Sequence, residues 1–100
     1  MEASLLTIDH IKIAAERIAK QYGVKRVYLF GSYAKNAATP ESDIDLLIEK
    51  GKPISLIDLS GMRIKFENEL KTSIDLLTTD GTESEFRKEI AGTEVLLYEE

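Results

Sequence analysis

Three short segments rich in β-branched and aromatic residues alternate with two longer amphipathic segments, and this alternation is what most restricts the fold. The short segments span residues 24–30, 44–49 and 73–79, and turn-forming residues flank each of them. Such segments are typical of strands. The longer segments, residues 7–22 and 55–70, carry apolar residues three and four positions apart. That spacing predicts two helices, each with one buried face.

The order of these segments predicts an α/β (α+β) fold in which a small mixed β-sheet is flanked by helices. Residues 32–38 are expected to form a short helix or turn, residues 39–42 a loop, residues 83–91 another short helix, and residues 94–100 an apolar end. The connection between the first two strands is too short for a parallel crossover. We therefore expect these strands to run antiparallel or to be related through the short helix. The length of 100 residues suits a single domain, residues 1–100.

Local signals fix the ends and the buried faces of the helices. Thr7 is expected to cap the first helix, and Gly23 suits the left-handed position just after it. Gly61 weakens the second long helix. We expect the periodic apolar residues to face the core, namely Ile11, Ala14, Ala15, Ile18, Ala19 and Tyr22 in the first helix and Leu56, Leu59, Met62, Ile64, Phe66 and Leu70 in the second.

The composition excludes several classes of protein. Hydrophobic residues make up 43% of the chain and charged residues 31%, as in globular proteins, and cysteine is absent. No apolar segment approaches the roughly 20 residues of a membrane span, and the first ten residues do not resemble a leader. The formal net charge of −5 argues against direct binding to nucleic acid. We expect a cytoplasmic protein that can still bind a small anion through a divalent metal.

Two carboxylates interrupt the second predicted strand at its start. Because side chains alternate along a strand, Asp43 and Asp45 are expected to point to the same side, about 6 to 7 Å apart. Like charges at that spacing repel unless a cation lies between them, and Mg²⁺ prefers carboxylate and phosphate oxygens. The pair predicts half of a metal site, although acids at strand ends also serve as solvated turn residues.

A third carboxylate, Asp75, interrupts the third predicted strand between two apolar residues. If this strand neighbours the second one, Asp75 lies beside the first two acids at the interstrand spacing of about 4.8 Å. Three such carboxylates suit phosphoryl transfer, in which they hold two metals, or one metal while one of them acts as a base. Alternatively, Asp75 is a surface residue of an edge strand.

A Gly-Ser turn precedes the acids at a fixed distance. Gly31 would let the backbone approach a phosphate closely, and Ser32 would add a hydroxyl and the free N–H groups of a short helix. Lys35 would contribute a positive charge to the same phosphates, although an exposed lysine without such a role has the same sequence signature. Taken alone, Gly-Ser is most often only a turn. His10 is expected to be exposed in the first helix, and we assign it no chemistry.

These residues together resemble a known signature. The segment LFGSYAKNAATPESDIDLLIE is similar to that of the DNA polymerase β-like nucleotidyltransferase superfamily, in which Gly-Ser is followed by ten residues and then Asp-x-Asp, and SIDLL matches the third acidic strand. The resemblance extends from residue 27 almost to the end of the chain. In length the chain resembles the minimal nucleotidyltransferases that act as antitoxins to HEPN-type ribonuclease toxins.

The resemblance implies a role for each matching residue. Gly31 and Ser32 would hold the triphosphate of ATP, Asp43 and Asp45 would bind Mg²⁺, and Asp75 would complete the metal site and act as base. It also implies transfer of AMP to a tyrosine of the HEPN toxin, which inactivates the toxin. Many members of the family carry Arg-Gly where this chain has Lys35 and Asn36, so a role for that arginine is not carried over.

Two alternatives remain from the sequence. The chain could act as an antitoxin by binding alone, with its acids catalytically idle, or it could modify a small molecule such as an aminoglycoside together with a helical partner subunit. A domain of this size has little material for an acceptor-binding surface. We therefore expect it to work in a homo-oligomer or hetero-oligomer.

Overall fold

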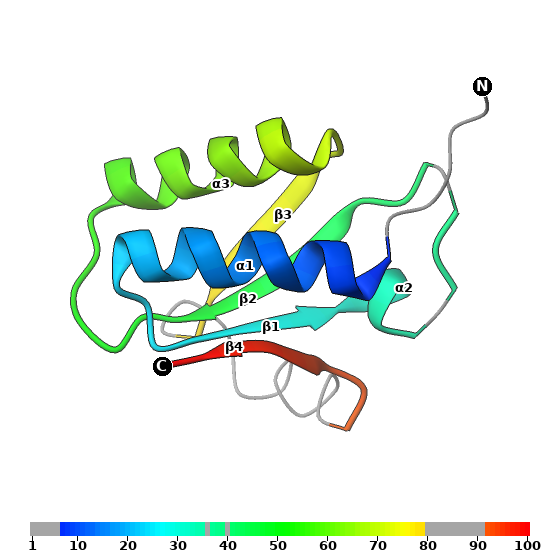
Figure 1. Ribbon diagram of the computed structural model, residues 1–100, viewed down its shortest axis with the longest axis horizontal. Coiled ribbons are helices and arrows are strands. Elements are labelled where there is room, and N and C mark those ends of the chain that lie inside the picture. Colours follow the sequence, from blue (N-terminus) through cyan, green and yellow to red (C-terminus); the bar gives the residue numbers. More distant parts are fainter. Residues whose placement is uncertain (1–6, 36, 40, 80–91) are drawn as a thin grey trace.

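The computed structural model describes residues 7–35, 37–39, 41–79 and 92–100, so the short helix expected at residues 83–91 lies outside the described residues. The elements are α1 (Ile8–Tyr22), β1 (Arg26–Phe30), α2 (Gly31–Ala34), β2 (Ile44–Glu49), α3 (Leu56–Leu70), β3 (Ile74–Thr78) and β4 (Val95–Glu99) (Figure 1).

The four strands form one mixed sheet in the order β3-β2-β1-β4. Strand β1 runs antiparallel to both β2 and β4, whereas β2 and β3 are parallel. The predicted mixed sheet and the antiparallel pairing of its first two strands are therefore confirmed. The sequence did not predict β4, because its residues lack an alternating pattern. The pairing of β4 with β1 includes a β-bulge opposite Val27 and Tyr28.

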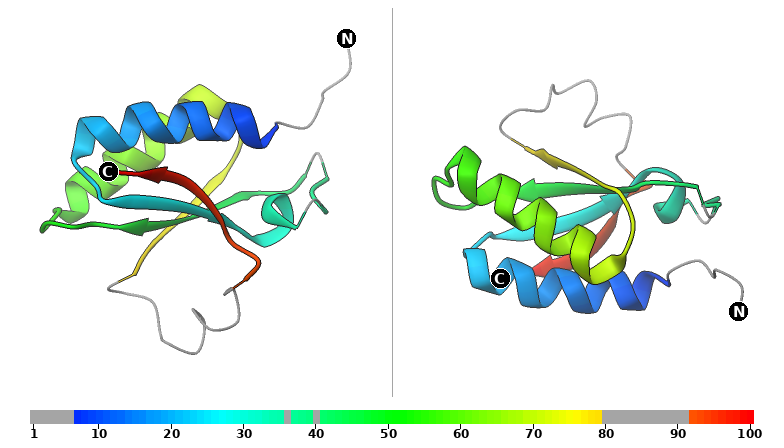
Figure 2. Two further views of the ribbon diagram at one scale, coloured as in Figure 1. Left: turned by 60° about the horizontal axis from the view of Figure 1, so that its bottom comes forward. Right: turned by 90° about the horizontal axis from the view of Figure 1, so that it is seen from above.

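Helices α1 and α3 lie side by side over the same face of the sheet (Figure 2). Thr7 caps α1 by accepting the N–H of His10, which is exposed, and Gly23 ends the helix in the left-handed conformation, both as predicted. The core lies between this helical layer and the strands. It contains Ile11, Ile18, Val27, Leu29, Ile44, Leu46, Ile48, Met62, Phe66 and Leu70, among others.

The predicted buried face of α3 is wrong at two positions. Met62, Phe66 and Leu70 are buried, but Leu56 is 80% exposed and Ile64 is 50% exposed. Ile64 follows Met62 by two residues, which places it about 200° around the helix from the core. Leu56 is the first residue of the helix, and the buried residues of α3 begin only at Met62.

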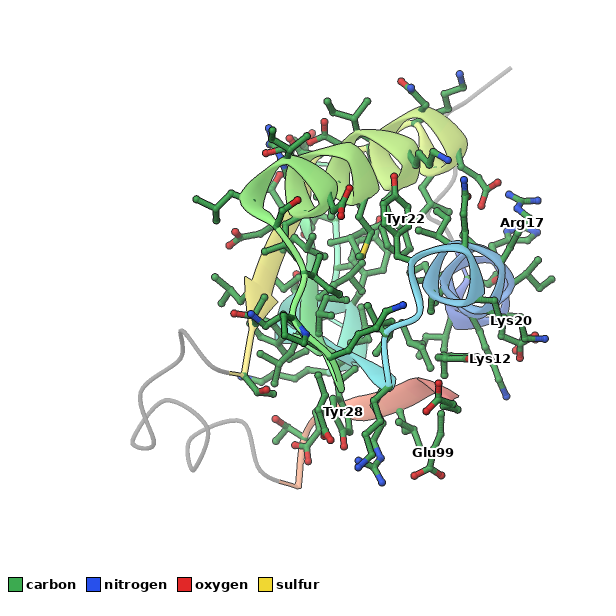
Figure 3. The ribbon with its side chains drawn as sticks, turned by 90° about the vertical axis from the view of Figure 1, so that its left-hand side faces the viewer. Lys12, Arg17, Lys20, Tyr22, Tyr28 and Glu99 are labelled. Atoms are coloured by element: carbon green, nitrogen blue, oxygen red, sulfur yellow. The ribbon has the colours of Figure 1, made fainter. Side chains whose placement is uncertain are left out.

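Gly61 lies where α3 approaches α1. A Cβ atom added at Gly61 would come within 3.1 Å of the Tyr22 hydroxyl oxygen. Tyr22 lies at the end of α1 and extends toward α3, with the Lys65 ammonium 5.4 Å from the centre of its ring (Figure 3). The glycine that weakens the helix by propensity therefore leaves room for the contact between the two helices.

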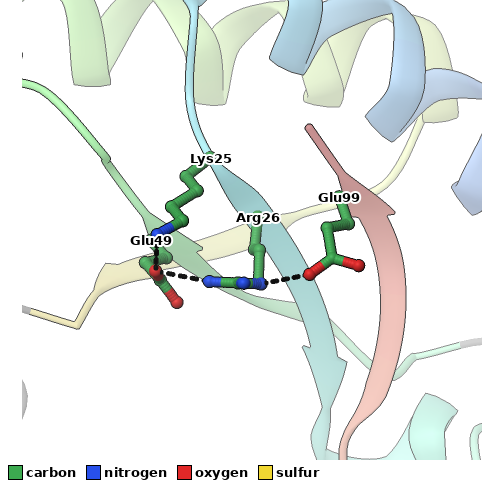
Figure 4. A network of polar contacts seen from close by, with 4 residues as sticks. All are labelled: Lys25, Arg26, Glu49 and Glu99. Atoms are coloured by element: carbon green, nitrogen blue, oxygen red, sulfur yellow. Dashed lines mark hydrogen bonds and ion pairs between the residues drawn. The ribbon is translucent and has the colours of Figure 1, made fainter.

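An ion-pair network joins three strands at one end of the sheet (Figure 4). The Arg26 guanidinium donates through Nη1 to Glu49 on β2 and through Nε to Glu99 on β4, each at 2.7 Å. The Lys25 ammonium lies 3.8 Å from the same Glu49 carboxylate.

No helix formed by the described residues is long and apolar enough to cross a membrane.

Candidate active site

Strand β1 ends at Gly31, which adopts a positive φ of +74° and begins α2. The neighbouring residue Phe30 pairs with Asp45 on β2, so the turn passes close to that carboxylate. A Cβ atom added at Gly31 would collide with the Asp45 side chain. The backbone angle favours glycine at this position, and any larger residue would also force the Asp45 side chain to move.

The turn after Gly31 is a one-turn helix. Ser32 lies in it and is half-buried, while the N–H of Lys35 at its end donates to the carbonyl of Gly31. Phe30 at the N-cap makes no side-chain hydrogen bond to the helix, and the N–H groups of a first helical turn have no acceptor within the helix. The Lys35 side chain is exposed and forms no ion pair with another described residue.

The loop before the acids is held by reciprocal hydrogen bonds. The N–H of Thr39 donates to the Ser42 hydroxyl at 2.8 Å, and the N–H of Ser42 donates to the Thr39 carbonyl at 2.9 Å. This is the turn expected from the sequence at residues 39–42. It delivers Asp43, which is exposed, to the position immediately before β2.

Asp45 and Asp75 are direct neighbours across β2 and β3. The parallel register pairs Ile44 with Ile74 and Asp45 with Asp75, and the N–H of Ile44 donates to the Ser73 carbonyl at 3.0 Å. Strand β3 is therefore the neighbour of β2, as the interpretation of Asp75 as part of the site required. Asp45 is half-buried and Asp75 is exposed, at the end of the sheet where α2 begins.

The three carboxylates interact electrostatically. Burial raises the pKa of Asp45 above its usual value, and the nearby charges of Asp75 and then Asp43 raise it further. A cation placed among them would offset this repulsion. A raised pKa with these causes is typical of a partly buried carboxylate that lies close to other acids.

The donor set fits a hard divalent cation such as Mg²⁺. All three groups are carboxylates, and Mg²⁺ usually takes one or two of these together with water and substrate phosphates. Within the described ranges, however, no three His, Cys, Asp or Glu side chains are arranged to hold one ion. The binding of Mg²⁺ by Asp43, Asp45 and Asp75 therefore stays a prediction.

The sequence of the chain matches a known protein family. Residues 12–100 match the model of the polymerase β nucleotidyltransferase family. The chain belongs to this family. A protein of Methanocaldococcus jannaschii with the provisional name protein adenylyltransferase is 41% identical over 73 residues, which are 73% of this chain and 78% of that protein. Protein adenylyltransferase MntA of Thermococcus cleftensis is 25% identical over 91 residues, which are 87% of this chain and 92% of that protein.

Solved structures share the nucleotidyltransferase fold. One described provisionally as a minimal nucleotidyltransferase superposes with a TM-score of 0.78 at 23% identity, covering 93% of this chain and 98% of the other. A chain from the complex of a tri-AMPylated HEPN toxin of Shewanella oneidensis with its MNT antitoxin has a TM-score of 0.68 at 18% identity, covering 93% and 71%. The predicted fold and family are thus confirmed.

One feature of the site was not predicted. Tyr33, the residue after Ser32, is buried and belongs to the hydrophobic core, so it anchors the short helix that follows Gly31. The available signal was an aromatic residue in a turn that otherwise carries small and polar side chains.

Proposed function

We propose that this nucleotidyltransferase is a Mg²⁺-dependent protein adenylyltransferase and that it transfers AMP from ATP to a tyrosine of a HEPN-type toxin. The observation that carries the proposal is the pairing of Asp45 with Asp75 beside the Gly31 turn. Asp45 on β2, Asp75 on β3 and the Gly31 turn, which passes against the Asp45 side chain, lie together at one end of the sheet. The family, and the relatives named as protein adenylyltransferases, support the reaction class.

In this proposal the Gly31 turn binds the triphosphate. The N–H groups at the start of α2 and the Ser32 hydroxyl donate to phosphate oxygens, because they have no acceptor within the short helix. Lys35, which is exposed at the end of α2, adds a positive charge near the phosphates. Asp43 and Asp45 hold Mg²⁺, which when bound would neutralise charge on the phosphates and the leaving pyrophosphate.

The reaction is an in-line substitution at the α-phosphorus of ATP. The tyrosine oxygen of the acceptor forms a bond to this phosphorus, and the bond from phosphorus to the bridging oxygen of the β-phosphate breaks. Asp75 accepts the phenolic proton, and its exposed position on β3 makes it accessible to an acceptor from another chain. The products are an AMP-tyrosine phosphodiester and pyrophosphate.

A HEPN-type toxin is the partner that the comparisons favour. The Shewanella oneidensis complex pairs an MNT antitoxin with an AMPylated HEPN toxin, and its matched chain shares this fold. In this proposal the toxin supplies the acceptor tyrosine and the surface around it. By this proposal the protein works as an antitoxin in a hetero-oligomer.

The test is transfer of label from α-labelled ATP to a purified HEPN toxin in the presence of Mg²⁺. We expect a mass increase of one AMP on a toxin tyrosine, its loss in Asp43→Asn and Asp45→Asn, and its loss in EDTA. Asp58→Asn, which changes an exposed acid in the first turn of α3, is the matched control and should retain transfer. Transfer that persists in both site variants would refute the proposal.

The same variants, assayed also for neutralisation of the toxin and for label on small molecules, test the two alternatives of binding alone and of a small-molecule acceptor. Neutralisation of the toxin by the Asp43→Asn/Asp45→Asn double variant, without any mass change, would favour binding alone. Label that appears on an aminoglycoside and not on protein would favour a small-molecule acceptor.

A further inference from the structure

The connection between α3 and β3 is a tight turn in a constrained conformation. Lys71 ends α3 with a φ of 55°, and it is the only non-glycine residue with positive φ within the described part of the chain. Its N–H donates to the Glu67 carbonyl at 2.8 Å. A residue with a Cβ atom costs roughly 1 to 2 kcal/mol in this region, so other contacts must hold the turn.

The side chain of Glu67 supplies such a contact from the other side of the turn. Its Oε2 accepts the N–H of Ile74, the first residue of β3, at 3.2 Å. The same oxygen lies 3.6 Å from Nη1 of Arg63, one helical turn earlier. Glu67 therefore binds both ends of the turn, through its backbone carbonyl and through its carboxylate.

The residue that Glu67 holds is the one immediately before Asp75. Ile74 is 4% exposed and packs in the core, and its neighbour Asp75 points away because side chains alternate along a strand. The carbonyl of Ser73, also in this connection, accepts the N–H of Ile44 on β2. The hydrogen bond at Ile74 therefore holds the first residue of β3 at the start of the ladder that pairs Asp75 with Asp45.

We propose that Glu67 is a positioning residue for nucleotidyl transfer: its carboxylate, held by Arg63, sets Asp75 opposite Asp45 by binding the Ile74 N–H. This inference rests on the proposed function, in which Asp75 acts as base. Glu67 itself does not touch ATP or the acceptor in this scheme. Its effect belongs to the chemical step and not to nucleotide binding, because the Gly31 turn lies on different elements.

The test compares Glu67→Ala with Glu67→Gln in the transfer assay, at a temperature well below the melting temperature of each variant. We expect Glu67→Ala to lower kcat about tenfold or more while KM for ATP stays near that of the parent, since a misplacement of about 1 Å can cost ~100-fold. Glu67→Gln keeps an acceptor for the Ile74 N–H and should recover most of kcat. Glu69→Ala removes a nearby acid that pairs with Arg17 on α1, so it is the matched control and should leave kcat unchanged.

A kcat for Glu67→Ala within about twofold of the parent would overturn the inference, as would equal losses in the alanine and glutamine variants. The proposed function fails separately, if the parent transfers no AMP at all. In that case amide hydrogen exchange decides the structural part of the inference, namely whether Glu67 holds the start of β3 in place. Faster exchange at Ile74 and a shifted Asp75 amide resonance in Glu67→Ala, but not in Glu67→Gln, support it, and unchanged spectra overturn it.

Discussion

Gly31 and Asp45 are so close that the smallest possible side chain at position 31 would collide with the Asp45 carboxylate. The contact joins the end of β1 to the second residue of β2, and it is formed while Gly31 has a φ of +74°. Backbone angle and space therefore restrict this position independently, and the two effects can be separated by mutation.

Gly31→Ala is expected to lower the free energy of unfolding by more than the roughly 1 to 2 kcal/mol that the backbone angle alone costs, and to abolish transfer. The matched control is Gly92→Ala, because Gly92 has a φ of +85° but nothing within 4 Å of an added Cβ atom. Urea denaturation of both variants gives the comparison. Equal losses would mean that the Asp45 side chain moves aside without cost.

Asp45→Asn is expected to stabilise the metal-free fold at neutral pH. Burial and the charges of Asp75 and Asp43 raise the pKa of Asp45 in the folded state. The folded state therefore binds this proton more tightly than the unfolded state, which favours folding at acidic pH and is lost as the pH rises through the raised pKa. At pH 7 the charged carboxylate is a net cost, which asparagine removes.

The measurement for Asp45→Asn is thermal unfolding in EDTA, at neutral pH and at about pH 4. We expect a higher melting temperature than the parent at neutral pH, and a smaller difference in acid. Asp9→Asn changes an acid in the first turn of α1, where negative charge favours the helix, and should destabilise instead. A lower melting temperature for Asp45→Asn at neutral pH would contradict the prediction.

Arg26→Lys is expected to lower stability without affecting transfer. Arg26 reaches Glu49 and Glu99 with two different nitrogens of one planar group, and the hydrogen bond that it donates to Glu99 raises the pKa of Arg26. A lysine ammonium cannot reproduce this two-sided geometry. The difference in urea midpoint between variant and parent should shrink with added salt, because the network is partly exposed. Arg17→Lys, at a more exposed ion pair, is the control and should change the midpoint less.

Gly61→Ala is expected to stabilise the protein by about 0.5 kcal/mol. Alanine favours a helix interior over glycine by ~1 kcal/mol, but the new Cβ atom would lie 3.1 Å from the Tyr22 hydroxyl oxygen. Tyr22 is only half-buried, so its ring tip can shift by the few tenths of an ångström required. In a Tyr22→Phe background the gain should be larger. A net loss in that background would place the obstacle elsewhere.

The sequence was sufficient to predict the helix ends and the turn that depend on neighbouring residues. The Thr7 cap, the Gly23 helix end and the paired turn of Thr39 and Ser42 are encoded by neighbouring residues, and all three are present. The closeness of the Gly31 turn to Asp45 could also be expected from the sequence, because only a short connection separates the two strands that carry them. The metal and nucleotide roles of these residues remain predictions.

Features that depend on distant contacts were not readable in the same way. Strand β4 pairs with β1 through a bulge, which no local pattern specifies. Ile64 and Leu56 have core-like spacing, but their exposure follows from which side of α3 meets the sheet. In the sequence, Glu67 cannot be distinguished from other acids on a helix surface, because its hydrogen bond with the Ile74 N–H depends on the turn between α3 and β3.

The place of Asp75 in the sheet has an evolutionary consequence. Among the described strands β3 is an outer one and Asp75 is exposed, whereas Asp45 lies half-buried on β2 between two neighbouring strands. A single substitution at position 75 could therefore remove the proposed base while leaving the interior intact. Descendants that have lost turnover but still recognise a partner would be one mutational step away, by a change at position 75 or at the likewise exposed position 43.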